Sequence, residues 1–273
     1  MTQSDPPRAH LLEGARVYLS GPMDFAASRD LEMKLGWRNR VGEFLKDLGV
    51  TVFDPWHKPD VHGLDEYGRE GVDTDASRDE WTFENSENGA RARARCSEIF
   101  RETMHIDLRM VDTSDFTIAY CPTNIYSVGT PHEVVLCRQQ RKPVLFVSPQ
   151  VIFPSLDALK KHLANDPEGK RLLEQLMNEV PIKENPRGIP SLWYMPLVGG
   201  ESFFDGFGFA KYRERFCWER TPLDDREDAC SLERPLLPFL EELNRRLPKK
   251  WDNVKGKHVP NDDWLLWNLR DRQ

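Results

Sequence analysis

Short apolar runs alternate with amphipathic stretches over the first 150 residues of the chain. Four runs rich in β-branched and aromatic residues have the length of strands. They are RVYLSG (16–21), VTVFDP (50–55), FTIAYC (116–121) and KPVLFVS (142–148). The last is almost continuously apolar, which is typical of a strand buried on both faces of a parallel sheet.

The segments between these runs carry apolar residues at helical spacing. Helices are predicted from about residue 28 to 48, from 90 to 111 and from 131 to 140. Gly49 is well placed to cap the first of them, because glycine readily adopts the left-handed conformation of a C-terminal cap. Strands alternating with helices predict an α/β, doubly wound parallel sheet over residues 14–150, preceded by a flexible N-terminus at residues 1–13.

The remaining segments are less regular. The polar stretch from Trp56 to Asn88 has little periodicity of either kind, and we expect a long excursion from the sheet there. Residues 151–273 are predicted to form a C-terminal, α-rich extension of unknown role, with helices at about 155–162, 170–180 and 238–247. Within it, the glycine-containing stretch GFGFA (206–210) is expected to be a loop.

The composition indicates in which cellular compartment the protein works and which kinds of partner it binds. A formal net charge of −7 argues against a nucleic-acid polymer as partner, because phosphate neutralisation needs clustered Lys and Arg. Five widely spaced cysteines without a C-x-x-C pair are typical of reduced thiols in the cytoplasm. No stretch approaches the ~18 apolar residues of a membrane span, and residues 1–15 lack a signal-peptide core. We therefore expect a cytoplasmic protein with a small-molecule ligand and no membrane contact.

Two loops at the carboxyl ends of predicted strands are candidates for a site, because ligands of parallel α/β sheets bind there. In the first, SGPMD (20–24), Gly21 permits close approach of a ligand to the backbone, although a tight turn explains the sequence equally well. The second, NIYSVGTPHE (124–133), ends in a helix start suited to a phosphate or carboxylate. Thr130 and Glu133 also have the spacing of a capping box, which would explain both residues without any function.

Two aspartates, Asp107 and Asp115, precede the third predicted strand with the spacing D-x7-D. Alone, the first is typical of a solvent-facing helix residue and the second of a turn. Together with YLSGPM (18–23) and S-x-G-x-x-x-E (127–133), they occur in an order and spacing that resemble the nucleoside 2-deoxyribosyltransferase family and its relatives, the nucleotide N-glycosidases. The resemblance covers roughly residues 14–150.

This resemblance implies a flavodoxin-like or Rossmann-like core that cleaves the N-glycosidic bond of a nucleoside or nucleotide. Glu133 matches the family's nucleophile, which forms a glycosyl-enzyme intermediate, and Asp107 matches the aspartate that serves the leaving base as general acid or base. The loop that lines the sugar and base corresponds to residues 18–23. The candidate substrate-binding residues are Tyr18, Ser20, Gly21, Pro22, Met23, Asp115, Ser127 and Gly129.

The residue six positions before Glu133 limits the range of expected substrates. The family's deoxyribosyltransferases typically carry an aspartate there, which binds the sugar 5′-hydroxyl, whereas the 5′-monophosphate N-hydrolases carry a serine that helps to bind the phosphate. This chain has Ser127. An aspartate would repel a phosphate, while Ser127, Gly129 and the helix N-terminus can donate to it. We therefore expect a nucleoside 5′-monophosphate, with the sugar passed to water in preference to another nucleobase.

Three alternatives stay open. GTPHE (129–133) is also similar to the G-G-x-G-T-x-x-E loop of the lysine-decarboxylase-like phosphoribohydrolases that release cytokinin bases, although the preceding P-G-G is missing. A binding module would use the same pocket to sense a nucleotide without turnover. NAD cleavage shares the chemistry, but no G-x-G-x-x-G follows the first strand.

No cofactor or metal is expected, because His57 and His62 lack a clear third ligand. His105 and His132 are expected to be surface residues rather than proton carriers. The resemblance also implies a homo-oligomer, for which the aromatic-rich C-terminal part could supply an interface.

Overall fold

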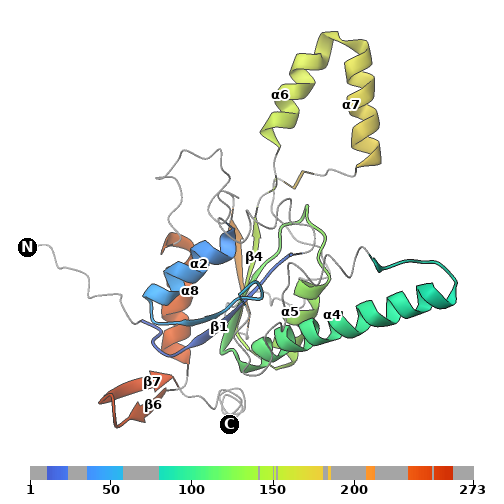
Figure 1. The fold of residues 1–273 in the computed structure, drawn as a ribbon. Helices are drawn as coiled ribbons and strands as arrows, with labels where there is room; N and C mark the ends of the chain where they lie inside the picture. Colours follow the sequence, from blue (N-terminus) through green and yellow to red (C-terminus); the bar gives the residue numbers. More distant parts are fainter. Residues whose placement is uncertain are drawn as a thin grey trace, which may run out of the picture.

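A five-stranded parallel sheet forms the centre of the protein (Figure 1). The computed structural model describes residues 11–23, 36–57, 80–140, 142–149, 151, 153–180, 184–185, 207–212, 233–247 and 249–260. The strands are β1 (Arg16–Ser20), β2 (Thr51–Phe53), β3 (Phe116–Tyr120), β4 (Val144–Pro149) and β5 (Phe207–Tyr212). Their order is β2-β1-β3-β4-β5 and every neighbouring pair is parallel, which is the flavodoxin-like arrangement. The predicted α/β fold is confirmed.

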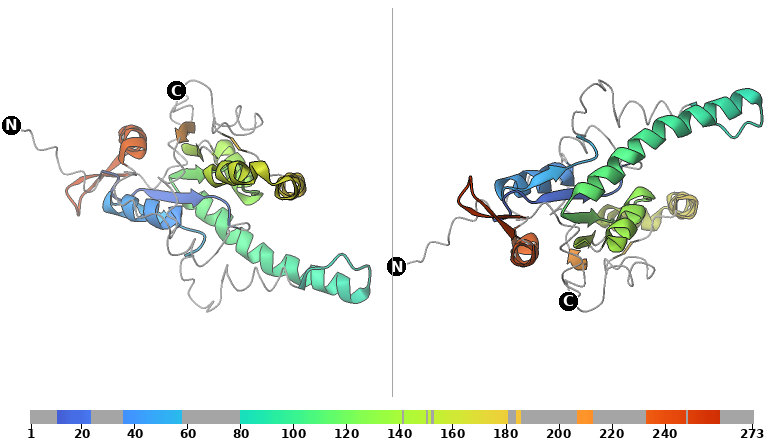
Figure 2. Two further views of the ribbon diagram at one scale, coloured as in Figure 1. Left: turned by 90° about the horizontal axis from the view of Figure 1, so that it is seen from above. Right: turned by 90° about the horizontal axis from the view of Figure 1, so that it is seen from below.

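Helices cover both faces of this sheet, as Figure 2 shows. One face packs against α2 and α8 and the other against α4 and α5; these helices span Trp37–Asp47, Glu233–Arg246, Glu87–Thr113 and Gly129–Gln139. Successive residues of a strand point to opposite faces. In β1, Val17 and Leu19 therefore join the core beneath α2 and α8, while Tyr18 joins the core beneath α4 and α5.

The sheet continues beyond residue 150, where the expected core ended. β5 pairs with β4 in parallel along its whole length, from Phe207 opposite Val144 to Tyr212 opposite Pro149. The prediction of a loop is wrong for residues 207–210, because pairing with β4 outweighs the low strand propensity of glycine. From the same part of the chain, α8 adds four residues to the core, namely Leu236, Phe239, Leu240 and Leu243, and Leu247 directly after it adds a fifth.

Two hairpins complete the described part of the C-terminal region. Helices α6 (Pro154–His162) and α7 (Pro167–Glu179), joined by a 3-10 turn at Leu163–Asn165, project away from the sheet after β4 (Figure 1). Strands β6 (Lys249–Asp252) and β7 (Lys257–Pro260) form an antiparallel pair. The described helices include none with the length and apolar character that a membrane crossing requires.

The predicted helices are confirmed, with shifted ends. Gly49 has φ +83 after α2, as expected of a C-terminal cap. The third C-terminal helix starts at Glu233, so Pro238 lies inside it rather than at its first turn. The start of the first predicted helix, most of the 56–88 excursion and both chain ends lie outside the described residues.

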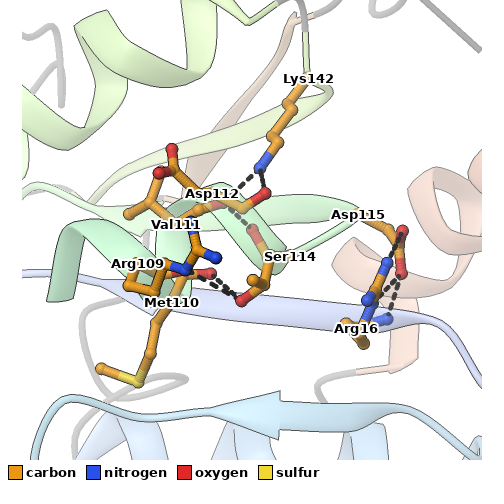
Figure 3. A network of polar contacts seen from close by, with 9 residues as sticks. Arg16, Arg109, Met110, Val111, Asp112, Ser114, Asp115 and Lys142 are labelled. Atoms are coloured by element: carbon orange, nitrogen blue, oxygen red, sulfur yellow. Dashed lines mark hydrogen bonds and ion pairs between the residues drawn. The ribbon is translucent and has the colours of Figure 1, made fainter. Parts of the chain in front are cut away.

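The junction between α4 and β3 holds a buried lysine (Figure 3). The Lys142 ammonium is fully buried and donates to the main-chain oxygens of Val111 and Asp112, where α4 ends. Ser114 Oγ also donates to the Val111 oxygen, at 2.8 Å. These bonds satisfy carbonyls that a helix C-terminus leaves without partners. Burial is the main cause that lowers the pKa of Lys142 to about 8.

A lysine whose pKa is depressed in the folded state makes stability depend on pH. Above the folded pKa the native chain loses a proton that the unfolded chain still holds, so the folded state gains stability between about pH 8 and 10. We expect the free energy of unfolding of the wild type to rise over this range relative to that of Lys142→Met, by on the order of 2 kcal/mol. Urea unfolding at a series of pH values measures the difference. Lys161→Met, at an exposed position of α6, is the control, and parallel curves for wild type and Lys142→Met would contradict the prediction.

Candidate active site

A buried carboxylate lies at the carboxyl end of the sheet. Glu133, in the second turn of α5, is 8% exposed. The Tyr18 hydroxyl donates to its Oε1 at 2.7 Å, and Ser20 Oγ donates to its Oε2. Both donors come from β1, although they are 115 and 113 positions away from Glu133 in the sequence. The carboxylate is therefore fixed on both oxygens by groups from another element.

The sheet topology accounts for this meeting. Tyr18 and Ser20 are two apart in β1, so both face the layer of α4 and α5. β1 lies beside β3, and α5 follows β3 and covers that same face. Strand order reverses between β1 and β3, where ligands of open α/β sheets characteristically bind. Glu133 is thus placed at the switch point of the sheet.

The capping-box interpretation of Glu133 is wrong. α5 begins at Gly129 with Val128 as N-cap, so Thr130 lies inside the helix instead of capping it. Ser127 Oγ accepts from the Thr130 N–H at 3.4 Å and donates to Thr130 Oγ1 at 2.9 Å. Because the Ser127 hydroxyl accepts the Thr130 N–H at the start of the helix, α5 begins earlier than the sequence pattern predicts. The Glu133 side chain is directed to β1 instead of back to the helix start.

Burial and hydrogen bonding act on the Glu133 carboxylate in opposite directions. Burial is the largest influence and raises its pKa, while the Ser20 and Tyr18 hydroxyls, and then the charges of Arg38 and His132, lower it. The pKa of Tyr18 is raised well above its ordinary value, first by burial and next by the charge of Glu133. Tyr18 therefore keeps its proton and remains a donor to the carboxylate.

The second candidate carboxylate, Asp107, lies in α4 and is half-buried. Its negative charge contributes to the raised pKa of Tyr18, directly after that of Glu133. An influence of this kind requires proximity, because Coulomb interactions fall off with distance and with screening. Asp107 therefore belongs to the surroundings of the Tyr18–Glu133 pair.

The predicted loop residues adjoin this pair from two sides. Gly21, Pro22 and Met23 follow Ser20 directly at the end of β1, and Pro22 is buried. Ser127 and Gly129 stand at the start of α5 on the other side. A Cβ at Gly129 would lie 4.0 Å from Glu133 Oε1, so the helix start and the carboxylate are close neighbours.

Asp115 is not brought to the site. It precedes β3 and therefore stands at the amino ends of the strands, opposite to the edge that holds Ser20. Its carboxylate accepts three bonds from Arg16, from N at 2.8 Å, Nε at 3.1 Å and Nη2 at 3.0 Å (Figure 3). Asp115 thus links the starts of β1 and β3, and we leave it out of the proposed site.

Comparison of the chain with models of known protein families gives no match, and no curated protein is significantly similar to it. The resemblance to the deoxyribosyltransferases therefore rests on the sequence motifs alone. The described residues contain no group of three His, Cys, Asp or Glu side chains placed to hold a metal ion.

Two neighbours of the site were missed by sequence reasoning. Cys121 follows β3, and its pKa is strongly raised by burial and by the charge of Glu133. Arg38, in the first turn of α2, is 1% exposed and lowers the pKa of Glu133. A signal for the arginine was available, because Arg38 directly follows Trp37 on the apolar face of its helix, where a charge requires a partner.

Proposed function

We propose that the protein cleaves the N-glycosidic bond of a nucleoside 5′-monophosphate, with Glu133 as nucleophile. The observation that carries the proposal is the buried Glu133 carboxylate, held on both oxygens by Tyr18 and Ser20 at the switch point of the sheet. A carboxylate kept out of water is costly unless its charge is used or compensated. Such a group is suited to stabilise, and then to bond, a positively charged anomeric carbon.

In the first step a Glu133 oxygen attacks C1′ of the sugar. The C1′–N bond breaks, its electron pair leaves with the base, and the base takes a proton from a general acid, for which Asp107 is the candidate. The transition state has oxocarbenium character, so the negative charge of Glu133 is most valuable at that moment. The donor hydroxyls of Tyr18 and Ser20 keep the carboxylate oriented for attack.

In the second step water attacks C1′ of the glycosyl-enzyme ester. The bond between C1′ and the Glu133 oxygen breaks and returns the carboxylate, while the water proton passes to the general base. The sugar 5-phosphate is then released. A second nucleobase that took the place of water would make the protein a transferase.

The start of α5 supports a phosphate on the substrate. Ser127 and Gly129 present a hydroxyl and a helix N-terminus next to Glu133. The first turn of α5 itself contains no acidic residue, which favours an anion at the positive end of the helix dipole. Assembly of the chain with copies of itself stays a prediction of the resemblance.

The test is release of free base, followed by chromatography, from ribo- and deoxyribonucleosides and their 5′-monophosphates, with and without an added acceptor base. Release from monophosphates without acceptor is expected. A requirement for the acceptor would favour transfer to a second nucleobase. If no substrate releases base, although a 5′-monophosphate binds, the catalytic proposal fails and a binding module takes its place.

A further inference from the structure

The one charged side chain of α2 that is fully buried, Arg38, spans the turn that follows β1. Its guanidinium donates to three carbonyl oxygens around that turn: Nε to Leu19 at 3.3 Å, Nη2 to Gly21 at 2.6 Å and Nη1 to Pro22 at 3.4 Å. Ser20, which binds Glu133, lies between these carbonyls. A single planar group thus sets the path of the backbone on both sides of Ser20.

The guanidinium is itself held in place. Asp54, at the carboxyl end of β2, lies 3.8 Å from Arg38 Nε and is 8% exposed. Its two oxygens are further bound by the Trp56 N–H at 3.0 Å and by His57 Nδ1 at 3.0 Å. A buried cation needs such a counter-charge and full hydrogen bonding to be tolerated. Arg38 therefore has a single defined orientation.

The turn is packed so closely on α2 that only glycine fits at its centre. A Cβ at Gly21 would lie 2.8 Å from Trp37 Cζ2 and 3.1 Å from Arg38 Nη2. The first of these is below any real contact of such an atom, and Trp37 is itself packed on Tyr120 with ring centroids 5.1 Å apart. The start of α2 and the end of β1 consequently behave as one unit.

Arg38 also acts on Glu133 through its charge. Several groups surround this carboxylate, and they are Tyr18 and Ser20 from β1, Arg38 from α2, Asp107 from α4, Cys121 after β3 and His132 from α5. His132 is exposed to solvent, which screens its charge, whereas Arg38 is buried. Arg38 is therefore the main charge that opposes the burial of Glu133, and it lowers the pKa of this group.

We propose that Arg38 is a positioning residue, which holds the Leu19–Pro22 turn so that Ser20 stays on the Glu133 carboxylate, and which places a buried positive charge beside that turn. The inference rests on the proposed function for its catalytic consequence, but the effect on Glu133 is independent of any substrate.

The experiment separates the charge of Arg38 from its shape. Arg38→Met removes both, and Arg38→Lys keeps the charge but cannot reach three carbonyls at once. Lys46→Met, at an exposed position of the same helix, is the control for the lost charge. Titration of the Glu133 carboxyl by carbon NMR is the first measurement, with the signal assigned by its absence in Glu133→Gln. Amide exchange at Gly21 and Met23 is the second.

In Arg38→Met the titration of Glu133 is expected to move to higher pH by about 1 unit or more, and the acid limb of the pH–rate profile to move with it. In Arg38→Lys the charge is kept but the turn is loosened, so the titration of Glu133 is expected to move to higher pH by less than in Arg38→Met. The two turn amides are expected to exchange at least about tenfold faster, and kcat is expected to fall at least about tenfold. Lys46→Met should match the wild type throughout.

An unchanged Glu133 titration in Arg38→Met would overturn the charge part of the inference. Wild-type exchange and kcat in Arg38→Lys would overturn the positioning part, and this variant decides the question if Arg38→Met does not fold. If the wild type releases no base from any substrate, the proposed function fails, while titration and amide exchange still test what Arg38 does to Glu133 and the turn.

Discussion

Replacement of Glu133 by glutamine is expected to reduce base release by at least about 10³-fold, because the nucleophile is lost while the shape of the side chain is kept. The amide retains one oxygen for Tyr18 or Ser20, so the surroundings are disturbed little. Steady-state kinetics on the best 5′-monophosphate measures the effect. Glu43→Gln, at an exposed position of α2, is the matched control and should retain wild-type rates.

Glu133→Gln is expected to be less active but more stable than the wild type near neutral pH. Burial raises the pKa of Glu133, so the folded chain holds the proton of this carboxyl more tightly than the unfolded chain does. The folded state of the wild type is therefore most stable below the unfolded pKa of the group and loses stability as pH rises through the folded pKa. Glutamine carries no charge to bury. The free energy of unfolding of Glu133→Gln relative to wild type should therefore increase from about pH 4 to pH 7, as measured by urea unfolding.

This combination distinguishes a functional carboxylate from a structural one. If Glu133 served stability, its replacement by a neutral residue would lower the free energy of unfolding of the protein. Active-site groups, in contrast, often lower the stability of the protein that contains them. Wild-type turnover in Glu133→Gln would remove the nucleophile from the proposal. Lower stability of the variant at pH 7 would instead assign the carboxylate to the packing between β1 and α5.

The second large effect is expected at Ser127. Ser127→Asp should lower kcat/KM for a 5′-monophosphate by about 10²-fold or more and leave the parent nucleoside much less affected, because the new carboxylate repels the phosphate. Free-base release from matched nucleoside and nucleotide pairs measures this selectivity.

The structure makes Ser127→Asp a clean test. Ser127 accepts the Thr130 N–H at the start of α5, and aspartate accepts such a bond as well as serine does. The helix should therefore keep its start. Ser127→Asn, which has nearly the same shape and no charge, is the control and should retain most of the monophosphate activity. Equal losses on nucleoside and nucleotide in Ser127→Asp would remove the reason for placing a phosphate there.

The comparison of motif and structure is instructive at two positions with similar local signals. In the sequence, a helix cap would explain Glu133 and a turn would explain Asp115, in both cases without any function. In the structure the Glu133 side chain points to β1 and accepts a bond from Tyr18, whereas Asp115 pairs with Arg16 at the opposite edge of the sheet. Spacing along the chain could not distinguish them, because it does not report which edge of a sheet a strand end occupies.

Strand β5 and Arg38 illustrate the complementary case, in which local signals were weak or discounted. The glycines of GFGFA argue against a strand, yet β5 pairs with β4 over six residue pairs. Arg38 lies on the apolar face of its helix, a signal that was overlooked, and three main-chain oxygens together with Asp54 account for its burial. Both outcomes depend on partners from distant parts of the chain.

The sequence by itself determined the alternation of strands and helices, and with it a parallel α/β sheet whose carboxyl edge holds the candidate loops. These features follow from hydrophobic period and from the conformational limits of single residues, which act locally. Only the tertiary structure decided that Tyr18, Ser20 and Arg38 gather around Glu133 while Asp115 does not. Strand order and the layer that each helix joins set those contacts, and they are decided by the burial of whole faces rather than by any short stretch of chain.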